Sequence, residues 1–114
     1  MAFDDIRDFE RETEHGRFRV RAMDLENGLL VLISDSERYR LGLSALAIPA
    51  SPGHVEPTST GFLSVGEDAV QVRILAESVA RRTGRTCMLV VAMKELNRTT
   101  MMEITKALRE YLPK

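Results

Sequence analysis

The stretch "CMLVVAM", residues 87–93, is apolar at every position. A strand with one face in water alternates apolar and polar side chains, because successive side chains point to opposite faces of the sheet. The stretch "LLVLI", residues 29–33, has the same unbroken apolar pattern. We therefore expect two central strands whose side chains are apolar on both faces of one sheet.

The second face of these strands needs a cover. Three arrangements would supply it: the helices could divide between the two faces, the sheet could close on itself as a barrel, or a second subunit could pack there. A large apolar patch on a single chain marks an interaction site, so we favour a dimer through the sheet or its edge. The side chains that we assign to this interface are Leu30, Leu32, Met88, Val90 and Ala92.

The first half of the chain is typical of a meander of strands. "FRVRAMDL", residues 18–25, starts with apolar and polar side chains in alternation, and Asn27-Gly28 follows it. This dipeptide accepts the positive φ angles of a type I′ turn, so it predicts a tight hairpin into residues 29–33. Further strands are expected at residues 9–14, 39–48 and 60–65.

Two helices are expected in the second half. Residues 67–83 carry apolar side chains at helical spacing, and Gly84 follows as a C-terminal cap. Residues 100–112 begin with a capping box, Thr100 to Glu103, and Pro113 ends the helix. The element order βββββαβα predicts an α+β fold: a largely antiparallel sheet of about six strands with two helices packed on one face.

The length of 114 residues indicates a single domain, residues 1–114. Residues 1–8 are expected to be a frayed N-terminal arm. Residues 49–59 hold three of the four prolines, which predicts a long, mobile loop. Loops of this length often bind partners, so we name Pro52, His54 and Val55 as candidate partner contacts.

Composition argues against nucleic acid and membranes as partners. Sixteen basic and seventeen acidic side chains give a net charge of −1, which supplies no field to attract polyanions. No segment approaches the roughly 20 apolar residues that a membrane helix needs. The acidic N-terminus, "MAFDDIRDFERETEHG", has no apolar run of signal-peptide length, so we expect a cytoplasmic protein.

The residues that usually carry chemistry are few and scattered. His15 and His54 are the only histidines, and neither has a cysteine or second histidine at ligand spacing. Cys87 lies in the apolar strand, which indicates a small buried side chain and not a nucleophile. We therefore predict no catalytic residue, no metal, no cofactor, and a protein that is not an enzyme.

Two stretches resemble a known family. "LSVGEDAVQVRILAESVARRTG" followed by "RTCMLVVAMKELNRTTMMEITKALREYL" is similar to the C-terminal half of the proteasome assembly chaperone 3 family, with an apolar strand, the Gly66-Glu67-Asp68 turn, a helix, a second apolar strand and a last helix. The meander "FRVRAMDLENGLLVLISDSERYRLGLSAL" matches the family in layout, so the resemblance covers most of residues 9–112.

The resemblance implies a small non-enzymatic protein that works as a homo- or heterodimer. Family members help proteasome α subunits assemble into rings, so the expected partners are a second copy of this chain and proteasome α subunits. The alternative hypothesis is a small-molecule-binding or regulatory sensor domain that uses a cleft between the sheet and the helices.

Overall fold

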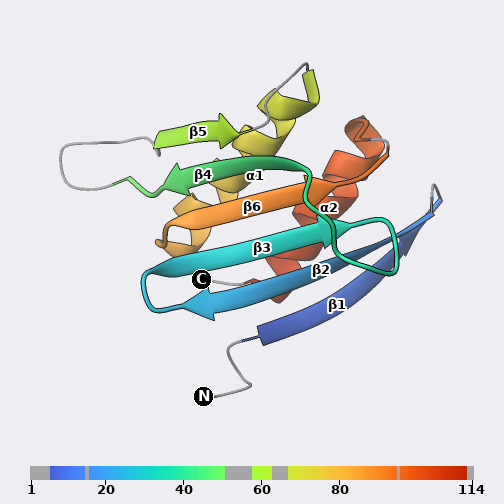
Figure 1. Cartoon of the computed structure of the whole chain (residues 1–114), viewed down its shortest axis with the longest axis horizontal. Coiled ribbons are helices and arrows are strands. Elements are labelled where there is room, and N and C mark those ends of the chain that lie inside the picture. The colour runs from blue at the N-terminus through green and yellow to red at the C-terminus, as the bar shows by residue number, and fades with distance from the viewer. Residues whose placement is uncertain (1–5, 15, 51–57, 63–66, 95, 113–114) are drawn as a thin grey trace.

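The computed structural model describes residues 6–14, 16–50, 58–62, 67–94 and 96–112. In this part of the chain the elements are β1 (Ile6–Thr13), β2 (Gly16–Leu25), β3 (Gly28–Ser34), β4 (Leu43–Ile48), β5 (Thr58–Phe62), α1 (Glu67–Thr83), β6 (Cys87–Ala92) and α2 (Arg98–Tyr111) (Figure 1).

One sheet contains the strands in the order β1-β2-β3-β6-β4-β5. β5 is a short strand at the edge of the sheet beside β4, and the structure describes its backbone but not its side chains. All neighbours are antiparallel except β3 and β6, which run parallel. The α+β class, with a mostly antiparallel sheet and two helices, is confirmed for the described residues.

The two strands with unbroken apolar sequence, β3 and β6, are neighbours in the middle of the sheet. Leu30 lies opposite Met88, and Leu32 lies opposite Val90. A parallel pair is usually buried on both faces, which agrees with the absence of charge from both strands. The prediction that these strands are central is confirmed.

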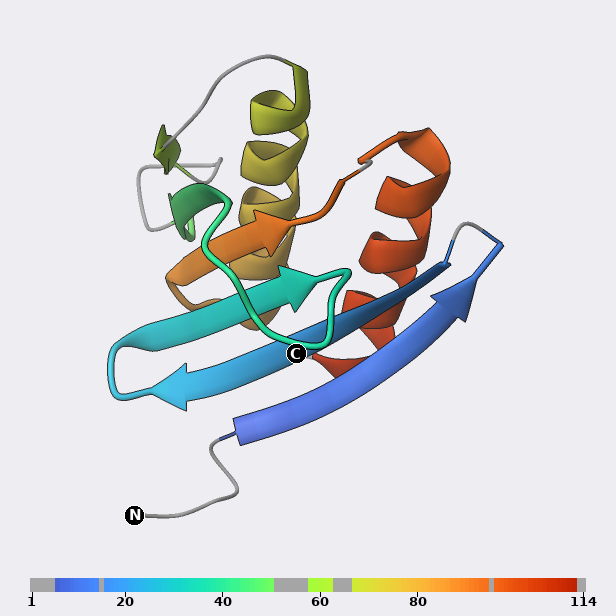
Figure 2. The same cartoon turned by 45° about the vertical axis from the view of Figure 1, so that its right-hand side comes forward.

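Both helices lie on the same side of the sheet, as Figures 1 and 2 show. The molecule is only 22 Å thick along its shortest axis, which is the depth of one sheet layer and one helix layer. Between these layers is a core of fully buried side chains, whose largest members include Phe18, Val20, Val31, Ile33, Val72, Leu89, Ile104 and Leu108.

The hairpin between β2 and β3 forms one residue earlier than the sequence predicted. Leu25 lies opposite Gly28, so the two-residue turn is Glu26-Asn27. Gly28 is needed for a different reason than a turn angle: a Cβ atom there would lie 2.6 Å from the carbonyl oxygen of Thr86. The glycine therefore permits a close approach of the chain before β6.

The first helix has the predicted bounds, and its end has the predicted cap. Gly84 adopts a φ of +70°, and its N–H donates to the carbonyl of Ala80. The second helix starts earlier than predicted, because Asn97 is the N-cap and its Oδ1 accepts from the N–H of Thr100 at 2.9 Å. The predicted capping box at Thr100 is wrong.

Of the arm expected to be frayed at residues 1–8, residues 6–8 belong to β1, and 1–5 lie outside the described residues. β1 begins at Ile6, which lies opposite Met23, and the Asp8 carboxylate pairs with Arg21 at 2.7 Å. These contacts hold residues 6–8 in the sheet.

The strand expected at residues 39–48 also begins later, at Leu43. Residues 35–42 form a loop instead, in which Arg40 donates to the Asp35 carboxylate at 3.0 Å and to the carbonyl of Ala92 at 3.2 Å. Of the loop expected at 49–59, residues 58 and 59 belong to β5, and 51–57 lie outside the described residues.

Candidate functional site

The side of the sheet that faces away from the helices is the open face. A row of apolar side chains crosses four adjacent strands there, with Met23 opposite Leu30, Leu30 opposite Met88, and Met88 opposite Leu46. Leu32 lies beside this row on β3. All five side chains are only partly buried. We call these five residues the apolar patch.

One end of the open face is covered by the loop at residues 35–42, which crosses it (Figure 1). Beneath this loop Ser34 is fully buried, and its hydroxyl donates to the carbonyl of Arg38 at 3.0 Å. Val90 and Ala92 lie on the same face and are only 6% and 7% exposed. These two side chains are therefore largely buried within the single chain.

The β1–β2 side of the open face carries charge. Asp8 lies opposite Arg21 and Glu10 opposite Arg19, and each pair has an N–O distance of 2.7 Å. The guanidinium of Arg21 also lies 5.2 Å from the centre of the Tyr39 ring. An apolar centre with a polar border is the usual composition of a protein–protein interface.

The residues that the sequence assigned to an interface thus share one face of the sheet. Leu30, Leu32 and Met88 belong to the apolar patch, whereas Val90 and Ala92 lie nearer the covered end. The candidate partner contacts Pro52, His54 and Val55 lie outside the described residues, as does His15.

Two members of the apolar patch were missed by the sequence reasoning. Met23 follows Arg19 and Arg21 on the polar side of β2, so the alternation of side chains in this strand predicts that Met23 is exposed to water. Leu46 lies in β4, which pairs directly with β6. Only the strand order brings both beside Met88, and strand order is not visible in the local pattern.

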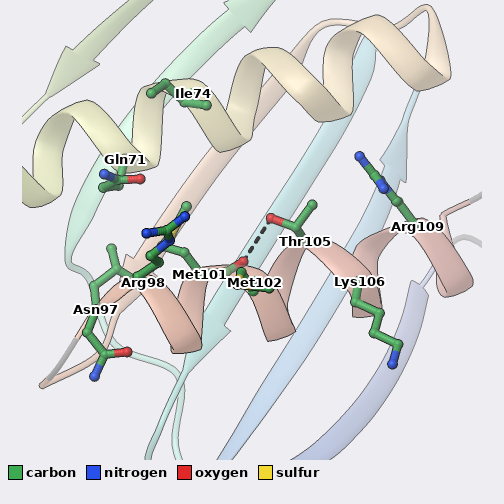
Figure 3. Close-up of a pocket in the computed structure, with 10 residues that line it drawn as sticks. Gln71, Ile74, Asn97, Arg98, Met101, Met102, Thr105, Lys106 and Arg109 are labelled. Atoms are coloured by element: carbon green, nitrogen blue, oxygen red, sulfur yellow. Dashed lines mark hydrogen bonds between the residues drawn. The ribbon is translucent and has the colours of Figure 1, made fainter.

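A second surface lies on the opposite side of the molecule, between α1 and α2. We call it the helix groove; it has a volume of about 800 Å³ (Figure 3). Its lining residues are Gln71, Ile74, Leu96, Asn97, Arg98, Met101, Met102, Thr105, Lys106 and Arg109. The two neighbouring methionines differ in exposure, since Met102 is 65% exposed while Met101 is 8% exposed.

The single cysteine is not a reactive group in the folded chain. Cys87 is fully buried between the sheet and the helices, and burial raises the pKa of its thiol to about 12. The thiol is therefore protonated at neutral pH, and a thiolate is the form that attacks. The prediction of a small buried side chain is confirmed.

Two further properties concern the described residues alone. No group of three or more histidine, cysteine or acidic side chains among them could hold a metal ion. None of the helices formed by these residues is long and apolar enough to cross a membrane.

Fold and surfaces together define a thin α+β protein that presents an apolar patch on one side and a helix groove on the other. No protein-family model and no curated protein matches this sequence. The fold is similar to that of a solved chain described as "Crystal Structure of a Novel Chaperone Complex for Yeast 20S Proteasome Assembly", with a TM-score of 0.67 and 15% sequence identity over 95% of each chain. This likeness establishes a shared fold.

Proposed function

We propose that this chain is a non-enzymatic assembly chaperone or scaffold of the proteasome α-ring type, and that it dimerises through the open face. The observation that carries the proposal is the apolar patch, on a fold similar over 95% of the chain to that of a chaperone complex for proteasome assembly. Such a protein acts by binding other proteins, so it needs no cofactor and no catalytic residue.

The open face is large enough for a dimer interface. A stable protein interface buries about 800 Å² on each partner. The sheet extends along the two longer axes of the molecule, which measure 41 and 37 Å, so its open face can supply this area. Two copies related by a two-fold axis would bring Leu30, Leu32 and Met88 against the same residues of the second copy. Val90 and Ala92 would support this contact from the covered end.

The proposed partners are therefore a second copy of this chain and proteasome α subunits, met in the cytoplasm. We assign contacts with an α subunit to the segment that contains Pro52, His54 and Val55. Its prolines and small polar side chains leave it little to bury within its own chain.

Two measurements test the proposal together. Sedimentation equilibrium at micromolar concentration should give twice the mass of 12.8 kDa. Affinity purification of the tagged chain from a native lysate should bring proteasome α subunits with it, identified by mass spectrometry. A chain that stays monomeric and retains no α subunit would overturn the proposal.

One observation favours a second candidate, a small-molecule sensor. The helix groove, with a volume of about 800 Å³, lies within the range of ligand pockets, which is about 300–1,000 Å³. Native mass spectrometry of the freshly purified chain separates the candidates. A bound metabolite in the absence of any protein partner would favour the sensor.

A further inference from the structure

The helix groove has an apolar floor and apolar walls that are open to solvent. Leu96 and Met101 form the floor, and both belong to the hydrophobic core. Ile74 on α1 and Met102 on α2 are 54% and 65% exposed, although each is a large apolar side chain. Covering them would remove apolar surface from water, which favours association.

Among the described residues that line the groove, the charged side chains are all basic. They are Arg98, Lys106 and Arg109, and no carboxylate of the described residues lines the groove. All three are exposed, and none of them takes part in an ion pair within the described part of the chain. Six other arginines there do pair with carboxylates: Arg11, Arg17, Arg19, Arg21, Arg40 and Arg85.

The acidic residues of α2 face a different neighbour. Glu110 accepts a hydrogen bond from Arg11 of β1, and this bond, with a smaller contribution from Glu103, raises the pKa of Arg11. Glu110 is therefore directed to the β1 side of α2, and Glu103, seven residues earlier and about two turns away, lies on the same side of the helix. They leave the positive charge of the groove without a partner on its own helix.

The two arginines of the groove are far apart along α2. Arg98 and Arg109 are separated by eleven residues, which is about three turns and 16 Å. Arg109 extends toward α1, and Lys106 points away from it (Figure 3). Met102 lies between the two arginines in sequence, so apolar surface separates two positions of positive charge.

We propose that the helix groove binds an acidic amphipathic helix of a protein partner. The apolar stripe of that helix would cover Ile74 and Met102, and carboxylates about three turns apart would pair with Arg98 and Arg109. A helix lying in a hydrophobic groove is a recurrent mode of peptide recognition. The charge of the groove selects acidic flanks over basic ones.

This inference goes beyond the proposed dimer and is independent of it. The groove is lined by residues of α1 and α2, which lie on one side of the sheet (Figure 2), whereas the apolar patch lies on the other side. A dimer through the open face would therefore carry two grooves on its outer surfaces. A single-stranded nucleic acid would also meet the cations, but it would leave Ile74 and Met102 without an apolar partner.

The test uses a synthetic peptide as a probe, because the partner is unidentified. The peptide is a fluorescein-labelled amphipathic helix with a leucine stripe and glutamates on its flanks, and a matched peptide carries lysine in place of each glutamate. Fluorescence anisotropy against the full chain should show binding of the acidic peptide. The lysine peptide should bind at least about tenfold more weakly, and added salt should weaken the acidic complex.

Exposed positions allow variants that keep the fold. The double variant Arg98→Glu/Arg109→Glu should lose at least about tenfold in affinity, since two attractive pairs become repulsive, and Met102→Ala should weaken binding as well. The matched control is Arg38→Glu, a charge reversal at an exposed arginine on the loop over the open face, which should bind the peptide as the unaltered chain does. Far-ultraviolet circular dichroism checks that each variant is folded.

Several outcomes would overturn the inference. These are equal affinity for the two peptides, unchanged affinity in the double variant, or no binding of the acidic peptide at about 1 mM. Displacement of the peptide by a single-stranded oligonucleotide would assign the groove to nucleic acid, and a change of mass in the double variant would assign it to a second copy. A folded monomeric Met88→Asp variant that still binds the peptide would show that the groove works without the dimer.

Discussion

Met88 and Leu89 are neighbours in β6 whose side chains point to opposite faces of the sheet, and a carboxylate at each should fail in a different way. Leu89 is fully buried in the core, whereas Met88 belongs to the apolar patch and is only partly buried. We expect Leu89→Asp to unfold the chain and Met88→Asp to leave a folded monomer.

The magnitudes follow from burial. An unpaired charge in a protein interior costs several kcal/mol, which is comparable to the 5–15 kcal/mol stability of a typical domain. In Leu89→Asp this cost lowers the free energy of unfolding of the chain. At Met88 the charge can stay hydrated in the monomer, so folding loses only part of the 1.5–3 kcal/mol that full burial of a methionine provides, roughly 1 kcal/mol.

Association should carry the larger cost for Met88→Asp. A two-fold interface would contain the substitution twice, and about 2 kcal/mol for each carboxylate sums to about 4 kcal/mol, or roughly a thousandfold in Kd. Sedimentation equilibrium measures this shift, and thermal melting by circular dichroism measures the stability of each monomer. A Met88→Asp protein that dimerises as tightly as the unaltered chain would refute the assignment of the open face. So would a Met88→Asp protein that unfolds as completely as Leu89→Asp.

Substitutions at three further positions test the fold itself. Asn97→Ala should lower stability by about 1 kcal/mol through loss of the α2 cap, and Asn97→Asp should retain most of it in thermal melts. Gly42→Ala should destabilise by about 1–3 kcal/mol, because its Cβ would lie 2.4 Å from the carbonyl oxygen of Val91; chemical denaturation measures this. Burial raises the pKa of Cys87 from 9.0 to about 12, so the unfolded chain loses this proton first, and stability should fall as pH rises from about 9 to 12. Cys87→Ala should remove that part of the pH dependence. An unchanged slope of stability against pH in Cys87→Ala would contradict the assignment of this dependence to the buried thiol.

The central strands and the first helix could be predicted because their side-chain periods are visible in the sequence. Residues 29–33 and 87–93 are apolar throughout, which placed them in the middle of a sheet. The same uniformity hid which set of side chains faces the helices, since Met88 and Leu89 are equally suited to burial. Packing of α1 and α2 decides that question, and it is a tertiary property.

The start of the second helix was mispredicted because two capping residues compete. Thr100 and Asn97 are both good N-caps. The chain selects Asn97, and the residue before it, Leu96, is buried in the same core as Met101. An apolar residue before the cap commonly packs against the fourth residue of the helix, and Leu96 and Met101 hold these two positions, which favours a helix that begins after Asn97.

The positive charge of the helix groove could not be predicted from the sequence, because it depends on which arginines form ion pairs elsewhere in the folded chain. Arg98 and Arg109 look like any other arginines until the ion pairs that the folded chain forms are known. Some of those pairs join β1 to β2 or β1 to α2, and no local pattern in the sequence predicts them.

Partial burial of the apolar patch bears on how the proposed dimer would form. A patch fully exposed in the monomer would make the single chain prone to aggregation, whereas a fully buried one would leave nothing to drive association. Met23, Leu30, Leu32, Leu46 and Met88 lie between these limits. The loop at residues 35–42 covers one end of the face, and ion pairs between β1 and β2 border another side. This cover leaves less apolar surface open to water in the single chain, and in the proposed dimer a second copy would cover the rest.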